Sequence, residues 1–281
     1  MEAKLWRLLL SLILIVAVLI IGLDVWQVRH GEASLLRLLW RFGRATRRES
    51  DVRSLSARKP AGARLAIIID DLGYRQDLFK EIKELRRPFT LAVLPDLPVS
   101  TQIAAEAPAL GMEVLLHLPM EPYRFPEVDP GAGALLMSMA PEELAQRTRR
   151  YLAQLPAAVG VNSHMGSKLT EHRDRMRPVM TVLAEKRLLF VDSLTSNMSV
   201  AYQEAKALGV RAARRQIFLD PEFNESSERR QFEAVTRRSE QGKDTIAIGH
   251  GHPLTLRLLR EYLPKWSSKG IRIVPVSQLT H

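Results

Sequence analysis

The chain has 281 residues, of which 46% are apolar and 26% charged, a composition typical of a folded globular protein rather than a disordered one. It contains no cysteine, which excludes disulfides, thiolate catalysis and zinc sites with cysteine ligands. Much of the net charge of +10 lies in residues 29–60, which have nine basic and three acidic side chains. Residues 61–281 have 30 basic and 26 acidic side chains, so we expect this nearly neutral part not to bind nucleic acid.

An apolar segment near the N-terminus predicts a membrane anchor. Residues 8–23 are almost uniformly apolar, and two basic side chains, Lys4 and Arg7, precede them. As a helix, residues 5–28 would be about 36 Å long, which is enough to cross the hydrocarbon core of a bilayer. We therefore interpret residues 1–28 as a single-pass anchor through which the protein contacts the membrane. A cleaved signal peptide is the alternative, although no small-x-small cleavage motif follows the apolar run.

Residues 29–63 form a predicted basic linker. Within it, residues 34–44 (SLLRLLWRFGR) place leucines and a phenylalanine at helical spacing, with arginines between them. This pattern is typical of a basic amphipathic helix on an anionic membrane surface, and packing on the chain's own domain is the alternative. The arginines that follow the anchor outnumber the basic side chains before it. Taken alone, the positive-inside rule would therefore leave the rest of the chain in the cytoplasm.

Residues 64–281 alternate between predicted strands and helices. The predicted strands are 65–69, 89–94, 113–117, 158–162, 188–191, 217–219, 245–248 and 271–276. The predicted helices are 75–86, 100–110, 141–155, 173–186, 199–208, 226–241 and 254–263. The strands are too continuously apolar to have one wet face, which favours a parallel sheet covered on both sides. We therefore predict an α/β fold with about seven βα units, arranged as a barrel rather than an open sheet.

Polar side chains gather at the carboxyl ends of these strands, where such folds place their ligands. Four of the seven histidines lie there, together with three aspartate sites. A set of three nitrogen and oxygen ligands with one open position is typical of a catalytic zinc or a similar divalent ion. The polar residues at or just after the strand ends are Asp70 and Asp71, His117, Asn162, Ser163 and His164, Asp192 and Ser193, Asp220, and His250 and His252.

The paired aspartates raise a geometric question. Adjacent residues in a strand point to opposite sides of the pleat, so Asp70 and Asp71 share a side only if the strand has already turned into its loop. The alternative to a site is that one of them caps the following turn. Without the other polar residues at the strand ends, His117 would be interpreted as a histidine of the apolar core. Of His250 and His252, we expect at least one to be functional.

Six motifs, taken in order, resemble the divergent branch of the polysaccharide deacetylases from about residue 64 to the end. The resemblance implies an irregular (β/α) barrel at residues 64–281, metal-dependent hydrolysis of an N-acetyl group on a glycan, and an envelope location. The motifs are IIIDDLG (67–73), EVLLHLPMEP (113–122), GVNSHMGSKLT (160–170), FVDSLTS (190–196), FLD (218–220) and IGHGHP (248–253).

The resemblance also implies roles. Asp70 corresponds to the general base, Asp71 to a metal ligand, and His250 to the acid that protonates the leaving amine. His117 corresponds to the first histidine of a His-x-x-x-His pair, but Glu121 occupies the second position. Either Glu121 or His164 is then the third ligand, and we favour His164. The third-motif arginine of typical members is not recognisable. The residues predicted to contact the substrate are Asn162, Ser193, Asp220 and His252.

We therefore predict a metal-dependent hydrolase, with zinc as the expected ion, that deacetylates N-acetylated glycans of the cell envelope. It would be anchored in a bacterial inner membrane with residues 64–281 on the periplasmic or extracytoplasmic side. A non-catalytic glycan-binding or scaffolding protein with a degenerate site is the main alternative, favoured by the altered second motif. A hydrolase acting on another bond, such as a phosphoester, is less favoured because no arginine cluster is evident at the strand ends.

Overall fold

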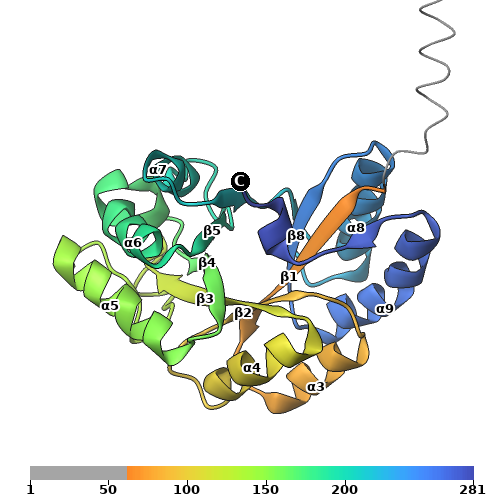
Figure 1. Ribbon diagram of the computed structural model, residues 1–281, viewed down its shortest axis with the longest axis horizontal. Helices are drawn as coiled ribbons and strands as arrows, with labels where there is room; N and C mark the ends of the chain where they lie inside the picture. Colours follow the sequence, from red (N-terminus) through yellow and green to blue (C-terminus); the bar gives the residue numbers. More distant parts are fainter. Residues whose placement is uncertain (1–61) are drawn as a thin grey trace, which may run out of the picture. The chain divides into compact units, whose positions relative to one another are not determined.

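The computed structural model describes residues 62–281, which form a curved sheet of nine parallel strands with seven α-helices around it (Figure 1). The strands are β1 (Arg64–Leu72), β2 (Thr90–Val93), β3 (Glu113–Met120), β4 (Ala158–Met165), β5 (Leu189–Asp192), β6 (Ala212–Arg214), β7 (Ile217–Phe218), β8 (Thr245–His250) and β9 (Arg272–Ile273). The helices are α3 (Gln76–Glu84), α4 (Ser100–Glu106), α5 (Pro141–Gln154), α6 (Arg173–Lys186), α7 (Ala201–Ala207), α8 (Glu225–Glu240) and α9 (Pro253–Ser268).

The predicted anchor and nearly all of the basic linker lie outside the described residues. Within residues 62–281, none of the helices combines the length and the apolar character needed to cross a bilayer.

The strand order is β6-β5-β4-β3-β2-β1-β8-β7, and β9 pairs with β1. The curvature and the parallel strands agree with the predicted irregular (β/α) barrel. Among the described residues, however, the sheet does not close, because β6 and β7 form its two edges. Only two residues separate these strands, whereas a parallel pair needs a crossover of a dozen residues or more. The barrel is therefore irregular at the junction between β6 and β7.

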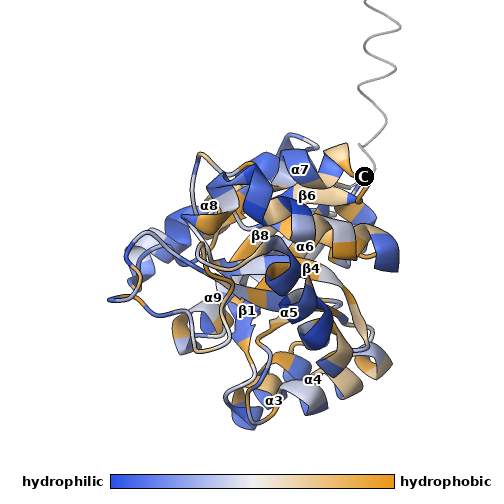
Figure 2. Ribbon diagram, turned by 90° about the vertical axis from the view of Figure 1, so that its left-hand side faces the viewer, coloured by the Kyte–Doolittle hydropathy of each residue, from blue (hydrophilic) through white to orange (hydrophobic). Residues whose placement is uncertain are grey.

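Alternate residues of the strands pack into two apolar layers. In β1, Leu65, Ile67 and Ile69 belong to the large layer between the sheet and the helices, whereas Ala66 and Ile68 belong to the smaller layer on the inner face. Figure 2 shows the apolar strands inside and helices with one polar face outside. The next inward position after Ile68 is Asp70, so the inner face changes from apolar to polar at the carboxyl ends of the strands.

Most of the predicted elements agree with the structure in kind and place, although β3 and β4 each continue three residues beyond their predicted ends. Residues 173–186 match α6 at both ends. Strand β6 was not predicted, because two of its three residues are alanines with little β-propensity. Helix α9 continues past Pro264, where the prediction ended it. Trp266 is fully buried beyond the proline, its Nε1 donating to Thr236 Oγ1 at 2.8 Å, and this packing outweighs the local cost of proline.

Candidate active site

A β-bulge at the end of β1 turns both aspartates towards one cavity. Asp70 faces the inner side of the sheet, in register with His250 of β8. The pairing of β1 with β2 shifts between Ile69 and Leu72, and Asp71 has a left-handed φ of 61°. The extra residue removes the alternation that would send Asp71 to the helix side, so both carboxylates line the same cavity. This answers the geometric question raised by the adjacent pair.

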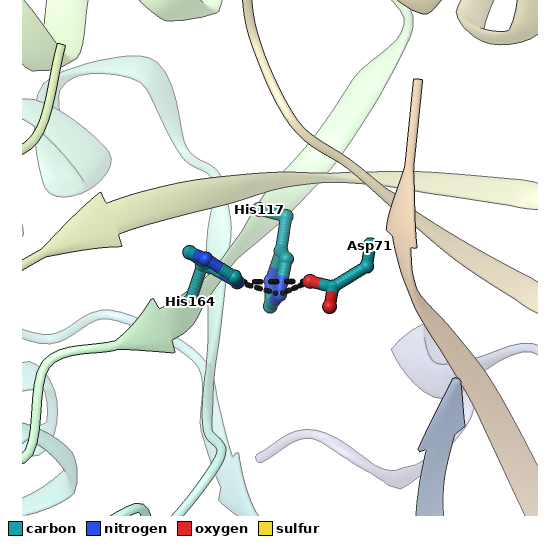
Figure 3. Close-up of side chains that lie close together, drawn as sticks. All are labelled: Asp71, His117 and His164. Carbon is teal, nitrogen blue, oxygen red and sulfur yellow. Dashed lines mark hydrogen bonds and ion pairs between the residues drawn. The ribbon is translucent and has the colours of Figure 1, made fainter. Parts of the chain in front are cut away.

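Asp71 meets His117 from β3 and His164 from β4, and the three side chains point towards one another (Figure 3). Asp71 Oδ1 lies 2.8 Å from His164 Nδ1 and 3.1 Å from His117 Nε2, and the two ring nitrogens are 3.2 Å apart. Burial opposes ionisation of Asp71, but the two histidines outweigh it and lower its pKa. The charges of Asp70 and Asp71 in turn outweigh the burial of His117 and raise its pKa.

The donor set of this cluster fits a divalent cation. Asp71 Oδ1 is buried, and among the described residues no donor approaches it with hydrogen-bond geometry. Its separations from the two ring nitrogens are close to the roughly 3.3 Å expected between ligand atoms around a tetrahedral ion with bonds of about 2.0–2.1 Å. One carboxylate and two imidazoles suit zinc and related transition metals.

Glu121, the alternative third ligand, binds groups outside the cluster. One of its carboxylate oxygens, Oε1, accepts from Lys168 Nζ at 2.6 Å, and Oε2 accepts from the backbone N–H of Met137 at 2.7 Å. Glu121 therefore holds the long loop after β3. The structure brings His164, rather than Glu121, to Asp71 and His117.

Asn162, one of the residues predicted to contact a substrate, is fully buried behind the cluster. Its Nδ2 donates to Asp70 Oδ1 at 2.9 Å, which turns its Oδ1 towards His117 Nδ1 at 2.8 Å. Because an amide oxygen can only accept, His117 carries its proton on Nδ1 and presents Nε2 to the cluster. Asn162 therefore orients both the candidate base and a candidate ligand. Burial, the largest influence on Asp70, raises the pKa of its carboxyl.

His250 lies on the other side of Asp71, with a carboxylate behind it. Its backbone N–H donates to Asp220 Oδ2 at 2.7 Å, and its Nδ1 lies 3.2 Å from Asp220 Oδ1. Its Nε2 is 3.5 Å from Asp71 Oδ2. Burial lowers the pKa of His250, but the hydrogen bond and charge of Asp220 outweigh it and raise the pKa to about 9. Asp220, predicted to contact a substrate, is thus buried and bound to His250 instead.

A second buried carboxyl group lies behind Asp220. The hydroxyl of Thr255 is 3.0 Å from Asp220 Oδ2 and 3.3 Å from Glu228 Oε2. The Glu228 side chain is fully buried, and burial together with the charge of Asp220 raises its pKa to about 7. Thr255 and Glu228 were not predicted as site residues, because their contacts with Asp220 join positions far apart in the chain.

The cluster opens into a cavity of about 430 Å³. Ser193, another predicted substrate contact, lines it, and four apolar side chains form part of its wall. Arg215 also lines the cavity: its Nε donates to Ser193 O at 2.6 Å, and its Nη2 donates to Leu194 O at 2.9 Å. Burial lowers the pKa of this guanidinium, with Asp70 opposing. The sequence analysis assigned it no role in the predicted deacetylase site. The apolar residues are Met165, Leu194, Phe218 and Ile248.

His252 lies outside the cavity wall. It is exposed at the start of α9, and its ring packs edge-on against Phe223 at a centroid distance of 4.5 Å. Gly251 between the two histidines allows a close approach of the backbone, since a Cβ there would come within 2.5 Å of Leu78. Of the two histidines, the structure therefore brings only His250 to the cavity.

Comparison with known proteins places this geometry in context. The sequence profile described as divergent polysaccharide deacetylase matches residues 67–280. The chain is 38% identical over 198 residues to the uncharacterized protein YibQ of Escherichia coli strain K12, a match covering 70% of this chain and 61% of YibQ. It is 36% identical over 200 residues to an uncharacterized protein of Haemophilus influenzae, covering 71% of each. The match thus spans less than two thirds of the E. coli relative.

Among solved structures, the fold is similar to that of an uncharacterized protein of Agrobacterium tumefaciens C58. The TM-score is 0.73 with 26% sequence identity, over 79% of this chain and 90% of the other.

Proposed function

Because the chain belongs to the divergent polysaccharide deacetylase family, we propose that it hydrolyses the acetamide of an N-acetylated glycan of the cell envelope. The observation that carries the proposal is the convergence of Asp71, His117 and His164 on one point, where the buried Asp71 Oδ1 lies close to two ring nitrogens but has no partner with hydrogen-bond geometry among the described residues. These three residues would hold a divalent ion, and we propose Zn²⁺ because it favours mixed imidazole and carboxylate ligands.

A divalent ion at this point supplies polarisation of the acetamide carbonyl and a more acidic water. Asp70 is the base in the proposal. Asn162 holds its Oδ1, which leaves Oδ2 on the cavity side to accept a proton from the attacking water. A carboxyl pKa raised by burial strengthens Asp70 as a proton acceptor.

His250 is the proposed acid. Asp220 binds its Nδ1 side and orients the ring, so Nε2 is directed towards the cluster. From there Nε2 donates a proton to the nitrogen of the departing amine as the C–N bond breaks. The amine leaves neutral, and the acetyl carbon keeps the oxygen of the attacking water as acetate.

The apolar part of the cavity wall suits the acetyl group. Met165, Leu194, Phe218 and Ile248 are well placed to surround a methyl group, whereas a phosphoester would bring charged oxygens against the same surface. Among residues 62–281, Arg215 is the single arginine lining this cavity. Acetamide hydrolysis is therefore better supported than phosphoester hydrolysis.

We also propose that residues 1–28 anchor the protein in the bacterial inner membrane, with residues 64–281 on the extracytoplasmic side. Proteolysis of intact spheroplasts tests this. The proposal requires residues 64–281 to be digested without lysis, and their protection until lysis would contradict it.

Metal content and acetate release test the enzymatic proposal. The purified full-length chain should contain close to one equivalent of zinc and release acetate from penta-N-acetylchitopentaose. Asp71→Asn is a suitable variant because asparagine tolerates a left-handed φ, so the bulge is retained while the charge is lost. We expect Asp71→Asn and His164→Ala to lose most of the zinc and at least about 100-fold in rate.

Two outcomes would overturn the proposal. A folded wild-type chain that binds no divalent ion would favour the non-catalytic glycan-binding alternative. Acetate release that persists in metal-free Asp71→Asn would place the reaction elsewhere.

A further inference from the structure

The exposed apolar side chains gather at one edge of the molecule. Four of the five large apolar side chains exposed in the described residues follow the carboxyl ends of β1, β3, β5 and β7, the edge at which the cavity opens. Scattered exposed apolar residues are ordinary, but such a concentration beside a site points to a ligand. The four are Tyr74, Tyr123, Met198 and Phe223, and the fifth, Leu110, precedes β3 at its amino end.

Tyr123 is exposed and yet held in place. Its side chain is 59% exposed, but its hydroxyl donates to Glu171 and its backbone N–H donates to Ser167 Oγ at 3.2 Å. Both partners belong to the segment that follows His164. The ring therefore stands beside the side of the site that carries the candidate metal ligands.

Phe223, which follows β7, is also exposed and held in place by a neighbour. It is 71% exposed, and one edge packs against His252 at 4.5 Å between ring centroids. The His252 ring in turn lies 6.0 Å from that of His250, which lines the cavity. Phe223 is thus linked through two ring contacts to the proposed acid.

The sheet order places the two rings on either side of the aspartate pair. Tyr123 follows β3 and Phe223 follows β7, and each of these strands is two positions from β1 in the order β3-β2-β1-β8-β7. In this order, the strand that ends in Asp70 and Asp71 lies midway between the two strands that the rings follow.

We propose that Tyr123 and Phe223 are stacking platforms for sugar units on either side of the reacting unit, so that the ligand is an oligosaccharide chain rather than a monosaccharide. This inference rests on the proposed function for the identity of the reacting unit. The C–H face of a pyranose packs on an aromatic ring much as another apolar surface does. Because both rings are already held by neighbours, binding costs little conformational entropy.

Binding by the full-length chain tests the inference, with N-acetylglucosamine and penta-N-acetylchitopentaose as probes and calorimetry as the measurement. The wild type should bind the pentasaccharide more tightly than the monosaccharide. Tyr123→Ala and Phe223→Ala should each weaken pentasaccharide binding by about 3- to 10-fold and leave monosaccharide binding unchanged. Tyr123→Phe keeps the ring but loses the hydrogen bond to Glu171, so a smaller loss is expected. Leu110→Ala, exposed at the opposite end of β3, is the matched control and should change neither affinity.

The outcomes separate this inference from the proposed function. Equal affinity for the two sugars, or an unchanged pentasaccharide affinity in the Tyr123→Ala/Phe223→Ala double variant, overturns the stacking surface even if acetate is released. Ring-dependent pentasaccharide binding without acetate release supports the surface and overturns the proposed hydrolysis. Asp71→Asn supplies the converse control, since it should retain the dependence on chain length while losing turnover.

Discussion

His117 and His250 face the same carboxylate, Asp71, from opposite sides, and they differ in the group behind them. On the β3 and β4 side, a neutral amide, Asn162, accepts from His117 Nδ1. On the β7 and β8 side, the charged Asp220 binds both the ring and the backbone of His250. A neutral partner fixes a tautomer, whereas a carboxylate also stabilises the imidazolium.

This difference gives the two histidines different roles in the site. An imidazole with Nδ1 protonated and backed by an amide presents an Nε2 lone pair, which a cation can use. An imidazole backed by a carboxylate keeps its second proton and can donate it. Asp71 serves both sides, with Oδ1 towards the ligands and Oδ2 towards His250. Variants that separate metal content from turnover should therefore distinguish the two sides.

The largest effect is expected from Asp220→Asn. Loss of the carboxylate removes the largest of the influences that raise the pKa of His250, so burial lowers that pKa and the proposed acid holds its proton less firmly near neutral pH. We expect acetate release to fall by about 100-fold or more, in line with the contribution of a general acid. Zinc content, measured on the same sample, should be unchanged. If zinc is lost together with activity, the two sides of the site do not act separately and the comparison between them is wrong.

Glu228→Gln tests the buried carboxyl behind Asp220 through the pH dependence of stability. The unfolded chain loses this proton near pH 4.5, but the folded protein loses it only near pH 7, so the wild type loses stability as the pH rises between these values. Glutamine cannot ionise, so the variant should be more stable by about 3 kcal/mol at pH 8 and nearly equal at pH 4.5. Urea unfolding at both pH values measures this.

Glu240→Gln on the same helix is the control for that measurement. Glu240 is exposed and forms a surface ion pair with Lys269, so its replacement should give a small and pH-independent change. A difference between Glu228→Gln and wild type that does not grow with pH would mean that folding does not raise the pKa of Glu228.

Asn162→Leu probes the ligand side. Leucine has a similar volume but neither donates to Asp70 nor accepts from His117, so both the tautomer and the orientation of His117 are released. We expect zinc affinity to fall by about 10- to 100-fold, the usual consequence of losing a group that orients a ligand. Competition with a chelator measures it. Unchanged affinity would mean that packing alone orients His117.

The smallest effect is expected from Glu121→Gln. This variant tests whether Glu121 is the third metal ligand, the alternative to His164 that the second motif left open. The change weakens an ion pair with the half-exposed Lys168, so stability should fall by no more than about 1 kcal/mol. Zinc content should be unchanged, because Glu121 lies outside the cluster. Loss of zinc in this variant would make Glu121 a ligand and contradict the assignment of His164.

The fold was predictable because its signals are local. Apolar runs and helix starts such as Pro141 with Glu142 determine elements within a few residues of each other, and alternation in the strands places Asp70, His117 and His250 on the inner face. The gathering of polar residues at strand ends followed from the same pattern.

The rest depends on contacts that no local pattern encodes. Asn162 and Asp220 were expected to contact a substrate, but their burial becomes visible only when neighbouring strands assemble around them. Arg215 lines the cavity from the two-residue link between β7 and β6, a strand that was not predicted, and Glu228 approaches Asp220 across a hydroxyl that belongs to another helix.

The left-handed backbone at Asp71 restricts how this position can vary during evolution. It must supply a ligand oxygen and also tolerate a φ of 61°, a conformation that, apart from glycine, aspartate and asparagine adopt more readily than most residues. Glutamate would keep the charge but strain the bulge, and glycine would relax the bulge but remove the oxygen. A lineage that loses the catalytic activity but keeps the fold can most easily replace this aspartate with asparagine, because the replacement requires a single-nucleotide change. An asparagine at this position in a relative would therefore indicate that the relative has lost the activity.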